Sequence, residues 1–224
     1  MPVRAIVFDV SGTLLNDIHA VWRATADAYA ALGIDSMRTL EEFKEKFKMP
    51  VPEFHKANGI QADMLHVADR NFRDSYPQYA GSVGIFPEVE KVLQELKGRG
   101  VTLGVASNIP SFFLREHLRE FNIDGYFDVV TGQEDCDEQK PSPKPIVITL
   151  EKLGFQPEES MYVGDMEEDI IAGKRAGVFT AAIVRDESYH PRWRLERQEP
   201  DFFISDLREL LPVYQSPVQS VSEG

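Results

Sequence analysis

The sequence predicts an α/β fold in which a parallel sheet is covered by helices and an all-helical unit is inserted near the N-terminus. Two observations lead to this prediction. From residue 85 onward, apolar segments of strand length alternate with amphipathic segments of helix length, the pattern of a doubly wound parallel sheet. Between residues 16 and 84, apolar residues recur only at helical spacing.

The first strand is predicted at residues 5–8, an unbroken apolar run typical of a strand buried on both faces. The run ends in Asp9, which Gly12 and Thr13 follow closely. A carboxylate at the carboxyl end of a central strand lies where open α/β sheets bind their ligands. Because Asp and Gly are also common turn residues, this position alone does not distinguish a site from a turn.

The stretch from residue 16 to residue 84 predicts a helical insert. Gly33 ends its first helix, and Pro50, Gly59 and Pro77 separate the later ones. The predicted helices cover residues 18–32, 40–47, 51–58 and 62–76. No strand pattern is visible here, so we expect a helical cap domain, residues 16–84, that is large enough to cover a site.

The rest of the chain predicts the main domain, a Rossmann-like doubly wound core formed by residues 1–15 and 85–212. Its further strands are predicted at residues 101–106, 126–130, 160–163, 178–184 and 202–204. Its helices are predicted at residues 87–97, 111–121, 145–153, 166–176 and 207–211. Residues 213–224 are rich in Ser, Gln and Pro, and we expect them to be disordered.

The composition argues against several classes of protein. The net charge of -13 repels nucleic acid and anionic membranes, and no basic patch offsets it. No apolar run approaches the ~20 residues of a membrane span, and the N-terminus lacks a signal-peptide core. The single Cys136 excludes an intramolecular disulfide. We therefore expect a cytoplasmic protein with no nucleic-acid or membrane partner.

Polar side chains follow three further predicted strands, and all should meet Asp9 at one edge of the sheet. They are Ser107, Asn108, Lys140, Asp165 and Asp169. Three crowded carboxylates repel one another, which favours a hard dication such as Mg²⁺ that also accepts water and phosphate as ligands. Lys140 would then face a phosphoryl oxygen, and Asp9 could attack phosphorus as a nucleophile.

Four motifs in this order resemble those of the haloacid dehalogenase (HAD) superfamily. They are F-D-V-S-G-T at residues 8–13, V-A-S-N at 105–108, K-P-S-P at 140–143 and G-D-M-E-E-D at 164–169. The resemblance covers residues 3–211, and the helical insert lies where the family carries a helical cap of the C1 type.

The resemblance implies a hydrolase, most simply a phosphatase, and assigns roles to the motif residues. Asp9 would be the nucleophile, Ser107 and Asn108 would bind the phosphoryl group, and Lys140 would stabilise its charge. Mg²⁺ would be held by Asp9, Asp165, Asp169 and the backbone carbonyl of Ser11.

The chain departs from the family at Ser11, where most of its phosphatases carry a second aspartate as acid and base. A serine cannot act as a carboxyl acid, and the loss of a positioned acid or base typically costs ~10² to 10⁴ in rate. His19, at the start of the first insert helix, is a candidate for the missing proton donor. Asp17 is expected to cap that helix or to lie in its first turn.

Four functions remain open. The first is a Mg²⁺-dependent phosphatase that acts on a small phosphorylated metabolite through an aspartyl-phosphate. The second is a phosphonate-cleaving relative, which would need a buried lysine in the cap, although the lysines there are expected on a solvated helix face. Those lysines are Lys44, Lys46, Lys48 and Lys56. The third is a metal-free 2-haloacid dehalogenase, in which Asp165 and Asp169 would repel the carboxylate substrate. The fourth is a degenerate domain that binds phosphorylated ligands without turnover.

Overall fold

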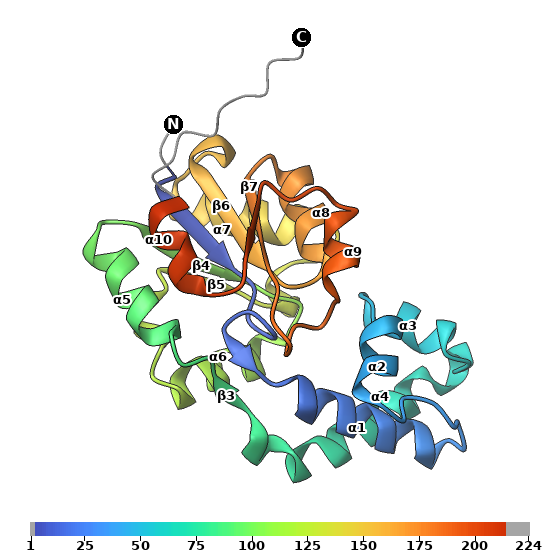
Figure 1. The fold of residues 1–224 in the computed structure, drawn as a ribbon. Helices are drawn as coiled ribbons and strands as arrows, with labels where there is room; N and C mark the ends of the chain where they lie inside the picture. Colours follow the sequence, from blue (N-terminus) through green and yellow to red (C-terminus); the bar gives the residue numbers. More distant parts are fainter. Residues whose placement is uncertain (1–2, 214–224) are drawn as a thin grey trace.

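The structure, a computed structural model, describes residues 3–213 and consists of an α/β unit with a group of helices beside it (Figure 1). The main sheet has six strands in the order β5-β4-β1-β6-β7-β8, and all neighbours are parallel. These strands are β1 (Ala5–Phe8), β4 (Thr102–Ala106), β5 (Val129–Thr131), β6 (Ser160–Gly164), β7 (Phe179–Ile183) and β8 (Phe202–Ile204). The predicted α/β class with a parallel sheet is therefore confirmed.

Helices cover both faces of this sheet. On one face, α5 (Val89–Gly98), α6 (Ser111–Glu120) and α10 (Leu210–Val213) join Ile6 and Phe8 of β1 in one apolar cluster. On the other face, α7 (Lys144–Leu153) and α8 (Glu167–Ala176) pack against Ala5 and Val7. Successive strand residues point to opposite faces, so a strand between two layers of helices needs an all-apolar sequence. This is why β1 lacks polar residues until the chain leaves the sheet.

Helices α1 (Ile18–Ala31), α2 (Leu40–Lys46), α3 (Val51–Ala57) and α4 (Leu65–Ser75) lie together to one side of the sheet (Figure 1). We call residues 17–83 the helical segment. Tyr29, Phe43 and Phe54 are buried in its own apolar cluster, which also takes in Met166 and Tyr189 from the α/β unit. The helical segment thus packs against the α/β unit through aromatic side chains.

The chain passes between the two parts through a pair of short strands. In this pair, β2 (Leu15–Asn16) and β3 (Gly84–Ile85) are antiparallel, with Asn16 opposite Gly84. The helical segment therefore leaves and returns to the α/β unit at neighbouring points.

Several expected elements differ from those observed. The strand expected at residues 126–130 begins only at Val129, because Asp124–Tyr126 forms a 3₁₀ turn. The helix expected at residues 62–76 divides into a 3₁₀ turn, Ala62–Met64, and α4. Strands β2 and β3 and helix α9 (Arg192–Glu196) were not expected, since such short elements show no periodicity.

Two predictions concern the termini and membranes. Apart from Val213, which ends α10, the expected disordered tail lies outside the described residues. None of the described helices is both long enough and apolar enough to span a membrane.

Candidate active site

The carboxyl ends of three adjacent strands bring the predicted residues to one edge of the sheet. Asp9 follows β1 in the middle, Ser107 follows β4 on one side, and Asp165 follows β6 on the other. Lys140 comes from the loop after β5, and Asp169 from the first turn of α8. All five side chains are buried.

Lys140 links the two ends of this group. Its Nζ donates to Asp9 Oδ1 and to Asp169 Oδ1, each at 2.7 Å. Burial alone would lower the pKa of Lys140, but the nearby carboxylates of Asp169 and Asp9 outweigh it and raise the pKa well above its usual value. Lys140 therefore stays charged.

Tyr162 is a site residue that the sequence did not reveal. Its hydroxyl accepts a hydrogen bond from Lys140 Nζ at 2.8 Å and donates one to the carbonyl of Ala106 at 2.7 Å. An aromatic residue inside an apolar strand reads only as core, so no signal in the sequence marks it. Tyr162 thus accepts the third hydrogen bond of the Lys140 ammonium group, beside those to Asp9 and Asp169.

Asp9, Asp165 and Asp169 each offer a carboxylate oxygen, and these oxygens lie within 4.8 Å of one another. Burial, helped by Asp169 and Asp9, raises the pKa of Asp165 well above its usual value. The pKa of Asp169 is raised to about 6, first by burial, although Lys140 opposes this. Lys140 thus leaves part of the negative charge in the group unbalanced.

Asp165 also has an unsatisfied oxygen. Its Oδ2 accepts a hydrogen bond from the backbone N–H of Tyr189 at 2.5 Å, whereas its buried Oδ1 has no hydrogen-bond partner among the described residues. A buried carboxylate oxygen without a partner is costly unless a cation or a donor reaches it. The orphaned oxygen and the all-oxygen donor set fit a hard divalent cation such as Mg²⁺.

Ser107 and Asn108 follow β4 but make different contacts. The Ser107 hydroxyl accepts a hydrogen bond from the N–H of Ile109 at 3.4 Å. The Asn108 side chain holds the backbone of Lys140 from both sides, with its Oδ1 accepting at 3.0 Å and its Nδ2 donating at 3.2 Å. Asn108 thus orients Lys140, and its predicted contact with substrate stays a prediction.

Ser11 is hydrogen-bonded to Asp17, a residue that the sequence predicts only to cap a helix or to lie in its first turn. Its hydroxyl donates to Asp17 Oδ2 at 2.5 Å, and the Tyr189 hydroxyl donates to Asp17 Oδ1 at 3.1 Å. Asp17 is the residue before α1, as expected, but its side chain makes no capping hydrogen bond. Burial raises the pKa of Asp17 to about 6, although both hydrogen bonds oppose this. The side chain thus belongs to the site rather than to the helix cap.

His19 does not share this environment. Its side chain is exposed, and its ring lies edge-on to that of Trp22 at 6.2 Å between centroids. Among the described residues, no hydrogen bond joins His19 to the site.

Lys44 was expected on a solvated face, and the structure leaves it only partly exposed. Its Nζ donates, at the surface, to the backbone carbonyl of Asp186 in the α/β unit. Burial lowers the pKa of Lys44, although Asp165 and Asp186 oppose this. Lys46 and Lys56 form exposed ion pairs with Glu42 and Glu53, as a solvated face predicts.

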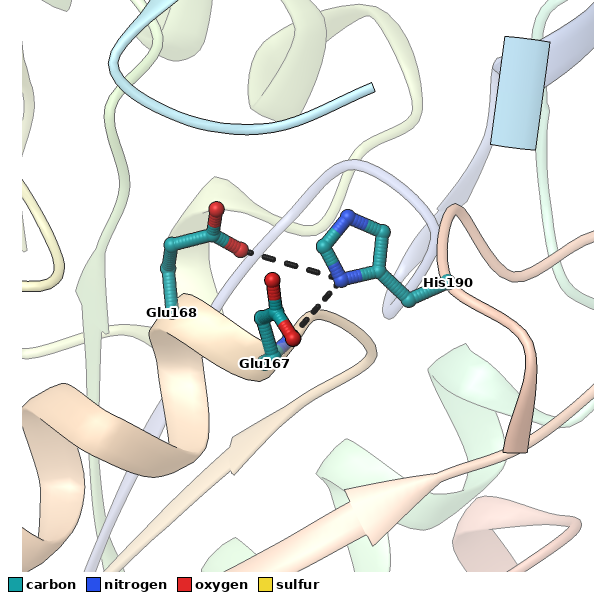
Figure 2. A group of neighbouring side chains, drawn as sticks. All are labelled: Glu167, Glu168 and His190. Atoms are coloured by element: carbon teal, nitrogen blue, oxygen red, sulfur yellow. Dashed lines mark hydrogen bonds and ion pairs between the residues drawn. The ribbon is translucent and has the colours of Figure 1, made fainter. Parts of the chain in front are cut away.

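A second group, Glu167, Glu168 and His190, also brings possible metal ligands together, but its histidine has no free ring nitrogen (Figure 2). His190 Nδ1 accepts a hydrogen bond from the Glu167 N–H at 3.0 Å, and its Nε2 lies 3.0 Å from the carbonyl of Phe47. Both ring nitrogens are therefore occupied. Glu168 Oε1 accepts from the N–H of Met49 at 2.9 Å. The group joins α8 to the helical segment.

Comparisons with known proteins show which family the chain resembles. A family model described as haloacid dehalogenase-like hydrolase matches residues 6–183. A phosphoglycolate phosphatase from Aquifex aeolicus is 31% identical over 228 residues, covering 96% of this chain and 99% of that protein. The pyrophosphatase PpaX of Oceanobacillus iheyensis is 29% identical over 221 residues, covering 95% and 97%. A haloacid dehalogenase-like hydrolase structure from Streptococcus pneumoniae shares the fold, with a TM-score of 0.83 at 21% identity over 95% of this chain and 99% of that chain.

Proposed function

Because the chain belongs to the haloacid dehalogenase-like hydrolase family, we propose that it is a Mg²⁺-dependent phosphatase of a small phosphorylated metabolite. The observation that carries the proposal is the buried group of Asp9, Lys140, Asp165 and Asp169. An ammonium beside three carboxylates, with one carboxylate oxygen orphaned, suits a dianionic phosphoryl group together with a dication. Relatives named phosphatase and pyrophosphatase support phosphoryl chemistry.

In the proposed mechanism, the Asp9 carboxylate attacks phosphorus, and the bond between phosphorus and the leaving oxygen breaks. Water then attacks the aspartyl-phosphate, which frees phosphate and restores Asp9. Lys140 supports both steps, because its ammonium group pairs with the Asp9 carboxylate and balances the charge on the phosphoryl oxygens. Mg²⁺, when held by Asp9, Asp165, Asp169 and the carbonyl of Ser11, would neutralise further phosphoryl charge.

We assign the helical segment the role of a cap over this site. Its aromatic cluster includes Met166 and Tyr189, and both residues adjoin the acidic group, Met166 by sequence and Tyr189 by its hydrogen bond to Asp165. A cap that excludes water strengthens every charge interaction beneath it. A cytoplasmic location is part of the same proposal, since small phosphorylated metabolites are substrates found there.

Lys44 favours a second candidate, cleavage of a phosphonate that carries an aldehyde. Such chemistry needs a neutral amine from the cap, and burial lowers the pKa of this one. Borohydride added with a 2-phosphonoaldehyde would then fix the substrate on Lys44 as a secondary amine. Lys56→Arg, which alters an exposed lysine, is the matched control for Lys44→Arg.

The deciding experiment is phosphate release from p-nitrophenyl phosphate. We expect turnover with Mg²⁺, none in chelator, and none for Asp9→Asn, whose fold circular dichroism would verify. Asp63→Asn, at an exposed position, should behave like wild type. Halide release from 2-chloropropionate in chelator would instead identify a dehalogenase, and the absence of turnover on all substrates would identify a degenerate domain.

A further inference from the structure

Ser11 lies two residues after Asp9, where the family resemblance implies an aspartate that acts as acid and base. A carboxyl group, that of Asp17, nevertheless lies beside Ser11. Asp17 Oδ2 lies 2.5 Å from the Ser11 hydroxyl oxygen, at the short end of the range for a hydroxyl bonded to a carboxylate. The Asp17 side chain is 3% exposed, so this contact is made out of bulk water. A serine and an aspartate therefore stand together where one aspartate would suffice.

Helix stability does not account for the placement of Asp17. An aspartate immediately before a helix normally accepts a hydrogen bond from the first turn, which is worth ~0.5–2 kcal/mol. Asp17 makes no such bond. Its two oxygens instead meet the hydroxyls of Ser11 and Tyr189, and the backbone N–H of Tyr189 binds Asp165. The side chain is thus tied to the acidic group at the strand ends.

We propose that Ser11 and Asp17 together replace the missing acid and base, with Ser11 touching the reacting oxygen and Asp17 acting through it. The inference rests on the proposed phosphatase function. Ser11 is then the catalytic residue, and Asp17 is a positioning residue that also stores the proton.

Protons balance over one cycle. As the leaving oxygen departs from phosphorus, the Ser11 hydroxyl gives it a proton and takes one from Asp17. When water attacks the aspartyl-phosphate, a water proton passes to the Ser11 oxygen and the serine proton passes to the Asp17 carboxylate. Asp17 is then ready for the next cycle, and Tyr189 holds its other oxygen in place throughout.

The test compares an aryl phosphate with an alkyl phosphate, whose leaving groups differ in their need for a proton. Nitrophenolate leaves without protonation, whereas an alkoxide needs a proton. In single-turnover measurements, Asp17→Asn should slow release of the alcohol from an alkyl phosphate by ~10²-fold or more. The first turnover of nitrophenolate should stay fast, and only the later hydrolysis of the aspartyl-phosphate should slow, because that step needs the same base for both substrates. Asp27→Asn is the matched control, because Asp27 lies in α1, the helix that Asp17 immediately precedes, and its carboxylate also accepts a hydrogen bond from a tyrosine, Tyr79, at 2.7 Å.

Two further variants keep the inference testable if Asp17→Asn folds poorly. Ser11→Ala should show the same selective loss, and adding Asp17→Asn to it should cost little more, because the two residues act as one unit. Ser11→Asp in the Asp17→Asn background should restore alkyl phosphate hydrolysis. Equal losses in the first-turnover release of the two leaving groups, or an alkyl rate that Ser11→Ala leaves unchanged, would overturn the inference while aryl turnover upholds the phosphatase. A wild-type protein inactive on both substrates overturns both.

Discussion

Gly12 is the residue at which the first loop comes closest to Asp165. A β-carbon built on Gly12 would lie 2.2 Å from Asp165 Oδ2, and its backbone has a φ of +73°. A side chain here would therefore cost left-handed backbone strain, roughly 1–2 kcal/mol, and would also displace the carboxylate. The strain affects only stability, whereas the displacement of Asp165 would also disturb the acidic group.

Gly33 allows these two costs to be separated. Its φ of +72° is nearly the same, but nothing lies within 4 Å of the β-carbon position. We expect Gly12→Ala and Gly33→Ala to share the strain cost, while Gly12→Ala alone loses phosphatase activity. Chemical denaturation and kcat, measured on both variants, provide the check. Full activity in Gly12→Ala would show that Asp165 can move without harm.

Glu168 predicts a specific pH dependence of stability. Burial raises the pKa of Glu168 from its usual 4.5 to about 7. The folded state therefore favours the protonated form, so this stabilisation is complete below pH 4.5 and is lost as the pH rises through 7. Glu168→Gln, which cannot ionise, should gain stability over wild type across this range, on the order of 3 kcal/mol at its upper end. Denaturant unfolding at several pH values, without metal, measures the difference, and parallel curves would contradict it.

The sequence predicted those site residues that follow strands directly. Asp9, Ser107 and Asp165 belong to this group, because parallel strands bring their carboxyl ends to one edge whatever the details of packing. Tyr162 and Asp17 could not be assigned in this way. The role of each depends on a hydrogen bond to one partner, and only the folded chain creates that bond.

At the scale of elements, Arg185, which follows β7, contacts both the loop after β1 and the segment between β3 and α5. It forms an ion pair with Glu88, which precedes α5, and both side chains are less than a tenth exposed, at 8% and 9%. Its Nη1 also donates to the carbonyl of Thr13 at 3.0 Å, and its guanidinium lies 3.7 Å from the centre of the Phe86 ring. Arg185 thus connects the first loop to the segment that follows β3.

Removal of Arg185 should be costly because it leaves Glu88 buried without its partner. We expect Arg185→Ala to lower the free energy of unfolding by about 3–5 kcal/mol. Arg38, paired with Asp35 on the surface, is the matched control, and Arg38→Ala should cost about 0–1 kcal/mol. Thermal or urea unfolding of the two variants measures both values. Similar losses would mean that solvent reaches the Arg185 pair.

Elements long enough to show a period were predictable, and short ones were not. Helix α1 repeats its buried positions over several turns, whereas β2 contains only Leu15 and Asn16. Two residues define no alternation, so β2 exists only because Gly84 and Ile85 return beside it. Whether such short elements form depends on tertiary contacts, which the local sequence does not reveal.

At the scale of the whole molecule, the buried carboxylates weaken the metal-free fold and a cation should reverse this. Mg²⁺ at 100 times its Kd would stabilise the folded state by about 2.7 kcal/mol, which raises the Tm of a chain of this size by roughly 5–10 °C. Asp165→Asn should raise the Tm in chelator, since it removes a carboxylate whose pKa is raised by burial, and should abolish the response to Mg²⁺.

Glu167→Gln provides the control for this measurement, because Glu167 belongs to the second acidic group. This variant should keep the full response to Mg²⁺. Calorimetry or a dye-based melt, run with metal and with chelator, separates the two groups. If Glu167→Gln lost the response to Mg²⁺ and Asp165→Asn kept it, the cation would bind at the group of Glu167, Glu168 and His190 instead of at Asp165.

The pairing of β2 with β3 makes the helical segment an exchangeable module. Because Asn16 and Gly84 face each other across antiparallel strands, the ends of the module are about 5 Å apart, a gap that a two-residue hairpin turn spans. Recombination at these points would replace the helices and leave the order of the sheet intact. Asp17 is the first residue inside the exchanged piece, and Ser11 is outside it. A donor module would therefore bring both a new cap over the acidic group and a new partner for Ser11, so that substrate range and proton transfer would be inherited as one unit.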